Sequence, residues 1–343
     1  MTRSLARRVR LADVAQAAGV GTSIVSRVLN GDATLSIRPE TRERILTAAR
    51  DLNYRPNAFA RGLKLARTMT LGLVIPNLAY PVNAEIIRGA ERRAAAAGYV
   101  VLLADSEEFS EAGEAFERLL RERRVDGLLI ASASTDEAVV RTLARAGLPF
   151  VLVNRRVERV GPSVTVDDVG GMKIGVEHLI SLGHRRIAYI GGPSDADTAR
   201  RRLAGFRVAM RGARLRAPAA RVAEAPFDEE GGFRAMVELL ERRPRPTAVA
   251  VWSLAAAVGA LAAARERGVH VPGDLSIVAF HDAPMASYLD PPLTTVRMPL
   301  REMAERGVEC LLALIDGEEV QSTVIGAPPL LIERASTRPP SED

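Results

Sequence analysis

Apolar residues recur at helical spacing in the first part of the chain, in three short stripes. These stripes consist of Leu11, Val14, Ala15 and Ala18; of Ile24, Val25, Val28 and Leu29; and of Ile45, Leu46, Ala49 and Leu52. Gly19 and Gly21 separate the first two stripes, because glycine tolerates the positive φ that ends a helix. Two short helices across a glycine turn, followed by a third, are typical of a helix-turn-helix, whose second helix enters the DNA major groove.

Beyond residue 68 the pattern changes to short apolar runs that alternate with helical stretches. The runs form two series, TLGLVIPN, YVVLLADS, VDGLLIAS and PFVLVNR, then RRIAYIGG, RVAEAPF, AVAVWS and LSIVAFHD. This alternation predicts parallel sheets covered by helices on both faces. Two series predict a two-lobed α/β sensor whose ligand binds beyond the carboxyl ends of the strands.

Charge is distributed unevenly between these two parts. Residues 1–66 hold 12 Lys and Arg against 5 Asp and Glu, a net charge of +7, whereas the remaining residues hold 35 against 37. A basic module joined to a near-neutral bulk indicates phosphate binding by the module. A solvated basic face is the alternative.

The second helix carries the candidate DNA contacts. Thr22 and Ser23 lie at its start, where short hydroxyl groups can reach base edges, and Arg27 lies one turn on, able to contact guanine or phosphate. Ser26 and Asn30 are the expected backbone contacts. The alternative for each is ordinary: Thr22 and Ser23 as helix caps, and Arg27 as a solvated charge.

Several runs resemble the LacI/GalR family of bacterial transcription regulators. They are LADVAQAAGV, SRVLNG, PETRERI and Y-x-P-N-A-x-A-R-x-L, and later GVEHLISLGHRRIAYIGGP, RRLAGFRVAM, ALAAARERGVHVPGDLSIVAF and YLDPPLTTVRMPLREMAERGVE. The resemblance implies an N-terminal all-α helix-turn-helix with a hinge helix, then a sensor similar to periplasmic sugar-binding proteins. Closure of its two lobes on a small effector would order or release the hinge helices of a dimer.

The resemblance also implies the domain boundaries. A helix-turn-helix domain spans residues 1–54, a hinge helix or linker spans 55–68, and an effector-binding and dimerisation domain spans 69–343. The N-lobe would comprise about 69–166 and 298–326, and the C-lobe about 167–297 and 327–343. Asn57, Ala60 and Leu63 would place the hinge helix in the minor groove, with Leu63 as a wedge between base steps.

The DNA-binding part departs from the family pattern in two respects. Gly21 stands where the family usually has serine, and Ile24 stands where it often has threonine, so the half-site preference does not transfer. The loop at 31–39 is two residues longer than usual, which leaves open how Ser36 and Arg38 meet the DNA backbone.

The effector site departs further. The resemblance implies that Arg202 hydrogen-bonds the effector, that Phe227 covers it, and that Asn83 and Asn154 line the cleft. The family's A-N-D-x-x-A is here V-W-S-L, with Trp252 in place of the sugar-binding asparagine, and G-F-D-D is A-F-H-D. His281 therefore stands where a carboxylate normally accepts ligand hydroxyls.

These departures lead to a hypothesis about the effector. An arginine without that carboxylate favours an anion, such as a sugar acid or another carboxylate, stacked on Trp252 or Phe227. His281 would make the affinity pH-dependent near its ordinary pKa of about 6.5. In the alternative, Trp252 simply fills the cleft and His281 is a structural residue of a sensor that has changed or lost its ligand.

Other functional classes fit the sequence less well. It contains no G-x-S-x-G elbow, no P-loop and no His/Cys cluster at metal spacing, so we expect neither an enzyme nor a cofactor or metal. One cysteine, Cys310, the lack of a membrane-spanning apolar run and an interrupted leader-like N-terminus predict a cytoplasmic protein. The main alternative is a solute-binding protein without a regulatory role, against which the basic helix-turn-helix argues.

The expected assembly follows from symmetry. A regulator of this kind, a repressor by the family resemblance, binds a near-palindromic operator as a homodimer. A dimer of dimers is the alternative, but the tail after Leu331 is short and polar and lacks heptads, which favours the dimer over the tetramer.

Overall fold

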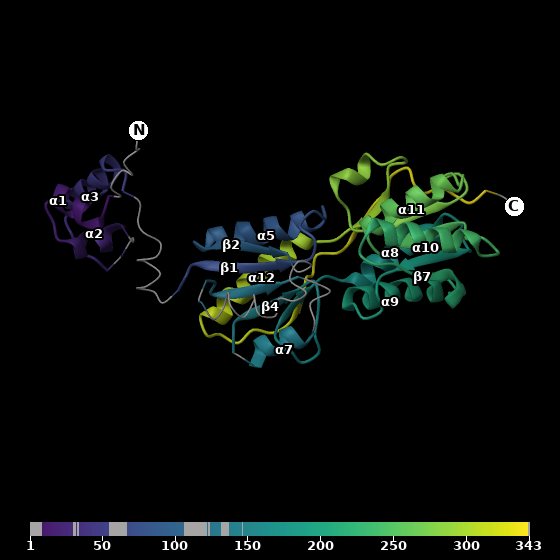
Figure 1. Ribbon diagram of the computed structural model, residues 1–343, viewed down its shortest axis with the longest axis horizontal. Coiled ribbons are helices and arrows are strands. Elements are labelled where there is room, and N and C mark those ends of the chain that lie inside the picture. The colour runs from purple at the N-terminus through teal and green to yellow at the C-terminus, as the bar shows by residue number, and fades with distance from the viewer. Residues whose placement is uncertain are drawn as a thin grey trace, which may run out of the picture. The chain divides into compact units, whose positions relative to one another are not determined.

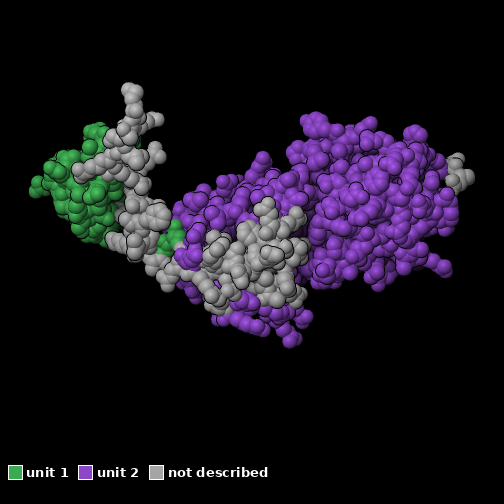
Figure 2. Space-filling model, viewed as in Figure 1, with its two compact units in different colours: residues 1–68 green, residues 69–343 purple. Residues whose placement is uncertain are grey.

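The computed structural model describes residues 9–29, 32, 34–54, 67–105, 122, 124–131, 137–145 and 147–341. The chain divides into two compact units, residues 1–68 and 69–343, which are coloured separately in Figure 2. The expected hinge residues Asn57, Ala60 and Leu63, and the expected backbone contact Asn30, lie outside the described residues.

Three helices pack into the core of the first unit (Figure 1): α1 (Leu11–Ala18), α2 (Thr22–Leu29) and α3 (Pro39–Asp51). Val14, Val25 and Ile45, one from each helix, are fully buried against one another in one cluster. Helix α1 ends at Gly19, whose φ of 64° lets its N–H return to the carbonyls of the last turn. The next helix therefore starts only three residues later, and the pair forms the predicted helix-turn-helix.

The second unit contains two six-stranded sheets. The first sheet has the order β11-β5-β4-β3-β1-β2, and all its pairs are parallel. Its strands are β1 (Thr70–Ile75), β2 (Val100–Asp105), β3 (Gly127–Ile130), β4 (Phe150–Val153), β5 (Ser163–Thr165) and β11 (Thr323–Val324).

The second sheet has the order β12-β10-β9-β8-β6-β7 and is parallel except for the pair β10 and β12. Its strands are β6 (Ile187–Gly191), β7 (Val222–Glu224), β8 (Ala248–Val251), β9 (Ser276–Phe280), β10 (Thr294–Arg297) and β12 (Leu330–Ile332). Strands β6, β8 and β9 are buried at every position, as expected for strands that helices cover on both faces.

The helices of the second unit pack on the sheets in pairs (Figure 1): α5 with α12, α8 with α9, and α10 with α11. Their bounds are α5 (Asn83–Ala96), α7 (Glu137–Arg145), α8 (Asp168–Ser181), α9 (Asp197–Gly212), α10 (Glu229–Glu241), α11 (Leu254–Glu266) and α12 (Leu300–Ile315), with 3₁₀ turns η1 (Ala219–Arg221) and η2 (Pro284–Ser287). The predicted architecture, a helical helix-turn-helix followed by a two-lobed α/β sensor with parallel sheets, is confirmed.

The chain returns late to the first sheet. After β10 has paired in the second sheet, α12 packs on α5 and β11 pairs with β5, and β12 then goes back to pair with β10. The chain thus passes from one sheet to the other several times. Residues that belong to the two sheets can contact one another near these connections.

Strand order locates the expected site. In the second sheet β6 and β8 are neighbours, while β7 lies on one side of them and β9 on the other. The chain therefore leaves β6 and β8 in opposite directions, and such a switch point opens a crevice at the carboxyl ends of the two strands. Gly192 and Trp252 are the first residues beyond those ends.

Glycines set the closeness of the helix pairs. A Cβ at Gly259 of α11 would collide with the backbone carbonyl of Glu229 at the start of α10. In contrast, a Cβ at Gly212, the last residue of α9, would meet nothing within 4 Å.

We expect Gly259→Ala to lower the free energy of unfolding by about 1–3 kcal/mol, because the two helix backbones must separate. Gly212→Ala should instead raise it by up to about 1 kcal/mol, since alanine is the better helix former. Urea denaturation of both variants measures these changes, and equal effects at the two positions would contradict the packing argument.

Candidate functional site

Helix α2 presents a row of polar side chains on the side away from the core. Val25 and Val28 are buried, Thr22 and Ser23 are exposed, and Arg27 is half-buried. Ser23 and Arg27 lie one helical turn apart, so that both can reach the same ligand surface. Three of the sequence-predicted base contacts are thus together on one face of one helix.

Arg27 is held by the loop that follows α2. Its Nε donates to Asp32 Oδ2 at 2.7 Å and its Nη2 donates to Thr34 Oγ1 at 3.0 Å. Hydrogen bonds from Thr34 and from Arg27 hold the pKa of Asp32 well below its usual value, so its carboxylate is ionised. The Arg27 side chain is thus tethered within its own unit, although it remains 39% exposed.

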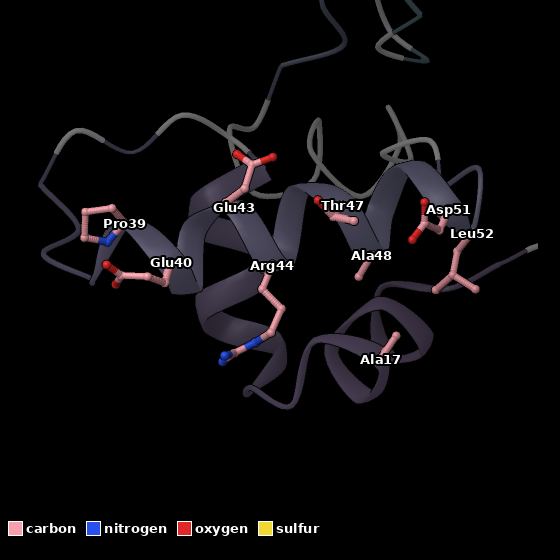
Figure 3. A pocket seen from close by; sticks show the side chains of 9 residues that line it. All are labelled: Ala17, Pro39, Glu40, Glu43, Arg44, Thr47, Ala48, Asp51 and Leu52. Carbon is pink, nitrogen blue, oxygen red and sulfur yellow. The ribbon is translucent and has the colours of Figure 1, made fainter.

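A surface hollow lies between α1 and α3 (Figure 3). Its lining residues are Ala17, Pro39, Glu40, Glu43, Arg44, Thr47, Ala48, Asp51 and Leu52. The one cation among them, Arg44, donates from Nε to the carbonyl of Ala18 at 2.8 Å, which closes the end of α1. Three carboxylates in this hollow oppose a phosphate backbone, and so the α2 face is the better candidate for DNA.

The second candidate site lies at the carboxyl ends of the second sheet. Trp252 follows β8 and is fully buried. Its indole ring covers the backbone of Gly192, where any Cβ would collide with the ring, and Phe227 packs on it with ring centroids 4.3 Å apart. Trp252 and Phe227 therefore form an aromatic wall at the switch point.

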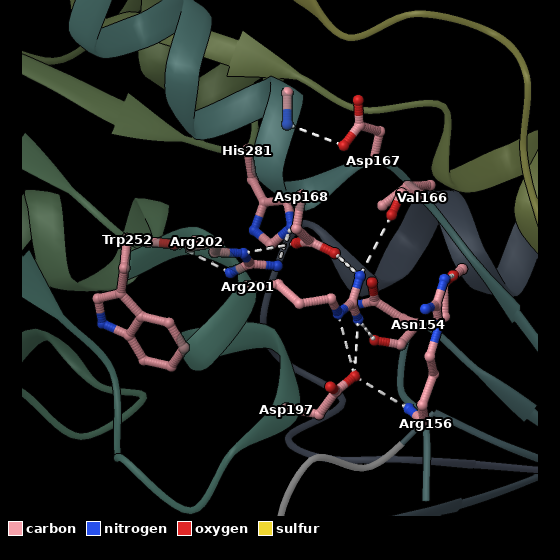
Figure 4. A network of polar contacts seen from close by, with 12 residues as sticks. Asn154, Arg156, Val166, Asp167, Asp168, Asp197, Arg201, Arg202, Trp252 and His281 are labelled. Atoms are coloured by element: carbon pink, nitrogen blue, oxygen red, sulfur yellow. Dashed lines mark hydrogen bonds and ion pairs between the residues drawn. The ribbon is translucent and has the colours of Figure 1, made fainter. Parts of the chain in front are cut away.

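Arg202 extends from α9 into the same place (Figure 4) and is 1% exposed. Its Nε donates to Asp168 Oδ1 at 2.7 Å and its Nη1 donates to the Trp252 carbonyl at 2.9 Å. Its Nη2 lies 3.2 Å from His281 Nε2, which must accept because a guanidinium has no lone pair to offer. The Arg202 guanidinium also stacks 4.1 Å from the centroid of the Phe280 ring.

This geometry does not support an anionic effector. Arg202 was expected to lack a carboxylate partner, yet Asp168 lies directly against it, and the Asp168 side chain is 0% exposed. A buried arginine with a carboxylate partner is already neutralised, so it offers an incoming anion little. Asp168 comes 34 residues before Arg202, and only the packing of α8 on α9 brings them together.

Arg201 extends the hydrogen-bond and ion-pair network of Arg202 to Asn154, which follows β4 of the first sheet. It pairs with Asp168 and, at 3.0 Å, with Asp197, and its Nη2 donates to the Asn154 carbonyl at 3.1 Å (Figure 4). Two arginines and two aspartates therefore balance each other here. Arg201, Asp168 and Asp197 were not predicted as site residues, although three consecutive arginines at 200–202 in an otherwise amphipathic helix were a visible signal.

The remaining residue that was predicted to line the cleft is Asn83, which lies at the start of α5 and contacts the loop after β1. Asn83 Nδ2 donates to the carbonyls of Pro76 and Asn77, at 2.6 and 3.0 Å, which fixes that loop. Next to it, the Tyr80 hydroxyl accepts from the N–H of Leu254 at 3.2 Å, at the start of α11. Burial raises the pKa of Tyr80 to about 12, so this link between the two sheets stays protonated.

Three buried polar atoms at the site have no hydrogen-bond partner in the described part of the chain. They are Trp252 Nε1, His281 Nδ1 and Asn154 Oδ1. Because His281 Nε2 accepts from Arg202, its hydrogen sits on Nδ1, so the set comprises two donors and one acceptor. Buried groups of this kind are normally satisfied, and at this site either ordered water or a polar ligand would supply the partners.

His281 does not titrate where the sequence analysis expected. Burial and then the charge of Arg202 lower its pKa well below 6.5, so the ring is neutral throughout the physiological range. The expectation of pH-dependent affinity near 6.5 is therefore wrong. His281, which follows β9, accepts a hydrogen bond from Arg202 and does not act as a pH switch.

The described residues contain no helix long and apolar enough to cross a bilayer. They also contain no group of three or more acidic, His or Cys side chains that could hold a metal.

Two family models match the chain. Residues 10–57 match "Bacterial regulatory proteins, lacI family", and residues 176–337 match "Periplasmic binding protein-like domain". Among relatives, the ribose operon repressor of Escherichia coli K12 is 35% identical over 94% of this chain and 98% of that protein. The transcriptional repressor PurR of Erwinia tasmaniensis is 36% identical over 94% and 95%.

Solved structures agree. The lac repressor dimer bound to operator and the anti-inducer ONPF is 30% identical, with a TM-score of 0.82 over 97% of this chain and 100% of that one. The CelR–cellobiose complex is 32% identical, with a TM-score of 0.73 over 96% and 100%.

The burial of His281 leads us to predict that the stability of the protein depends on pH. The unfolded state takes up its proton near pH 6.5 while the folded state does not, so the free energy of unfolding falls as the pH drops from 7 toward 5. His281→Gln should reduce this slope by up to about 1 kcal/mol per pH unit. Denaturation at pH 5, 6, 7 and 8 measures it, and an unchanged slope would sink the argument.

Proposed function

This chain belongs to the LacI family of bacterial regulatory proteins, and from that premise we propose that it is a ligand-controlled repressor that binds a near-palindromic operator as a homodimer. The observation that carries the proposal is the row of Thr22, Ser23 and Arg27 on the exposed side of α2. Hydroxyl groups and a guanidinium at the start of such a helix suit base edges in the major groove.

The relatives support repression and dimerisation. Both the ribose operon repressor and PurR are repressors by name, and the lac repressor structure is a dimer on its operator. In a symmetric dimer two copies of α2 would read two half-sites, which multiplies specificity. We extend the proposal to the domain boundaries, with reading by residues 1–54, a minor-groove hinge in 55–68 and sensing by 69–343.

For the effector we propose an uncharged ring compound with polar edges, of the kind represented by a neutral sugar or a nucleobase. Phe227, which is 36% exposed and packs on the buried Trp252, offers an apolar face to a ring, and three unsatisfied buried atoms offer two donors and one acceptor. A sugar acid or other carboxylate would have to compete with Asp168 for Arg202. Cellobiose in the CelR complex is an uncharged precedent among the structural neighbours.

The DNA-binding half is tested with Arg27→Ala. Duplexes are selected from a random library with the wild-type protein, and affinities for the selected and for a scrambled duplex are compared. We expect the variant to lose at least about tenfold in affinity for the selected duplex and little for the scrambled one, because a bidentate guanine contact is lost.

Arg50→Ala is the matched control, since Arg50 is an exposed arginine of α3 paired only with groups of its own helix. It should leave the preference for the selected duplex unchanged. A wild-type protein that selects no duplex would favour the alternative of a solute-binding protein without a regulatory role.

The sensing half can be followed through Trp252, which is the only tryptophan of the chain. A ring stacked beside it should change its fluorescence, and a ligand at about 100 times its dissociation constant should add roughly 2.7 kcal/mol to stability. We expect these responses with neutral sugars or nucleobases, weakened in Phe227→Ala and kept in Tyr288→Ala, whose tyrosine is 88% exposed. Responses to sugar acids alone would restore the anionic hypothesis.

A further inference from the structure

Resting on the proposed DNA-binding function, we infer that Asp32 is a positioning residue for Arg27 and thereby sets the base specificity of α2. The inference concerns a loop residue that does not itself reach the DNA bases. It acts through the arginine that does.

Asp32 and Thr34 form a fixed cradle for one edge of the Arg27 guanidinium. Asp32 Oδ2 accepts from Arg27 Nε at 2.7 Å, while Thr34 Oγ1 accepts from Arg27 Nη2 at 3.0 Å. Asp32 Oδ1 in turn accepts from the Thr34 N–H at 2.9 Å and from the Thr34 hydroxyl at 2.7 Å. Both carboxylate oxygens are therefore engaged, and the carboxylate cannot rotate without losing several bonds.

The backbone holds this cradle against the end of α2. The N–H of Asp32 donates to the Arg27 carbonyl at 3.0 Å, and the N–H of Leu35 donates to the Asp32 carbonyl at 3.3 Å. The loop thus folds back over the last turn of the helix before α3 begins at Pro39. Asp32 and Thr34 belong to the loop at 31–39, which is two residues longer than the family usually has.

The other edge of the guanidinium keeps its donors. Among the described residues nothing accepts from Arg27 Nη1, and one N–H of Nη2 also remains. This pair of N–H groups has the spacing that the O6 and N7 acceptors of guanine require. The Arg27 side chain is still 39% exposed, so its remaining edge is accessible.

Fixing Arg27 raises specificity in two ways. A free arginine adapts to any phosphate, whereas a held guanidinium loses less conformational entropy when it meets the one arrangement of acceptors that it fits. The negative charge of Asp32 also weakens attraction to phosphates in general, which lowers non-specific affinity. Together they increase the ratio of specific to non-specific binding.

The test compares Asp32→Asn with the wild-type protein on the selected and the scrambled duplex. We expect the variant to bind the selected duplex about tenfold more weakly and the scrambled one as tightly or up to about threefold more tightly. Thr34→Val, which removes only the hydroxyl, should shift the ratio in the same direction by less. Asp51→Asn is the control, because it removes the same charge from an exposed position of the same unit.

A second selection with Asp32→Asn gives a readout that a purely structural loop would not move. The guanine preference at one position of each half-site should relax, while the positions read by Thr22 and Ser23 keep theirs. Thermal unfolding of both proteins shows whether the variant is folded.

Three outcomes would overturn the inference. Equal tightening on both duplexes would mean that Asp32 only repels DNA, equal weakening would mean that it only stabilises the unit, and an unchanged guanine preference would mean that Arg27 needs no cradle. A wild-type protein that selects no duplex fails the proposed function instead, before the variant is considered.

Discussion

The sensor depends on one buried ion pair, between Arg202 of α9 and Asp168 of α8. A guanidinium that is removed from water must find partners for all its donors, and here the partners come from three elements: a carboxylate, the backbone carbonyl after β8 and the imidazole after β9. Satisfying Arg202 therefore fixes the ends of neighbouring strands relative to two helices. Because Arg202 holds the backbone carbonyl of Trp252 and the ring of His281, it also fixes the positions of Trp252 Nε1 and His281 Nδ1, which have no hydrogen-bond partner in the described part of the chain.

Much of this architecture could be predicted from the sequence. Buried parallel strands are continuous apolar runs, and the stretches around Ile190, Val249 and Val278 showed this plainly. Strand-end residues such as Trp252 and His281 were also predicted to share a site, because parallel strands end at one edge of a sheet. The neutralisation of Arg202 by Asp168 could not be predicted from the sequence, because only the packing of α8 on α9 brings the two side chains together. The expected charge of the effector depended on that unseen contact, whereas the expected pH dependence depended on a His281 whose pKa is instead lowered by burial and by the charge of Arg202.

The helix-turn-helix shows the same division between local and distant information. The face of α2 follows from helical spacing alone, because Val25 and Val28 must point inward and Ser23 and Arg27 outward. The tether from Asp32 depends instead on the path of an extended loop, which residue spacing does not determine. The acidic hollow beside α3 likewise gathers residues from two helices, so the sequence alone contains no direct sign of it.

The late return of the chain to the first sheet has a consequence for biosynthesis. Strand β11 and helix α12 are among the last elements to be made, and they pack on elements that were made much earlier, β11 on β5 and α12 on α5. On the ribosome, the first sheet must wait with α5 uncovered until the whole second sheet except β12 has emerged. The three helices of the first unit lie within residues 11–51, so their contacts with one another are local and can form early. A nascent chain would thus carry a finished DNA reader well before it carries a sensor able to govern it.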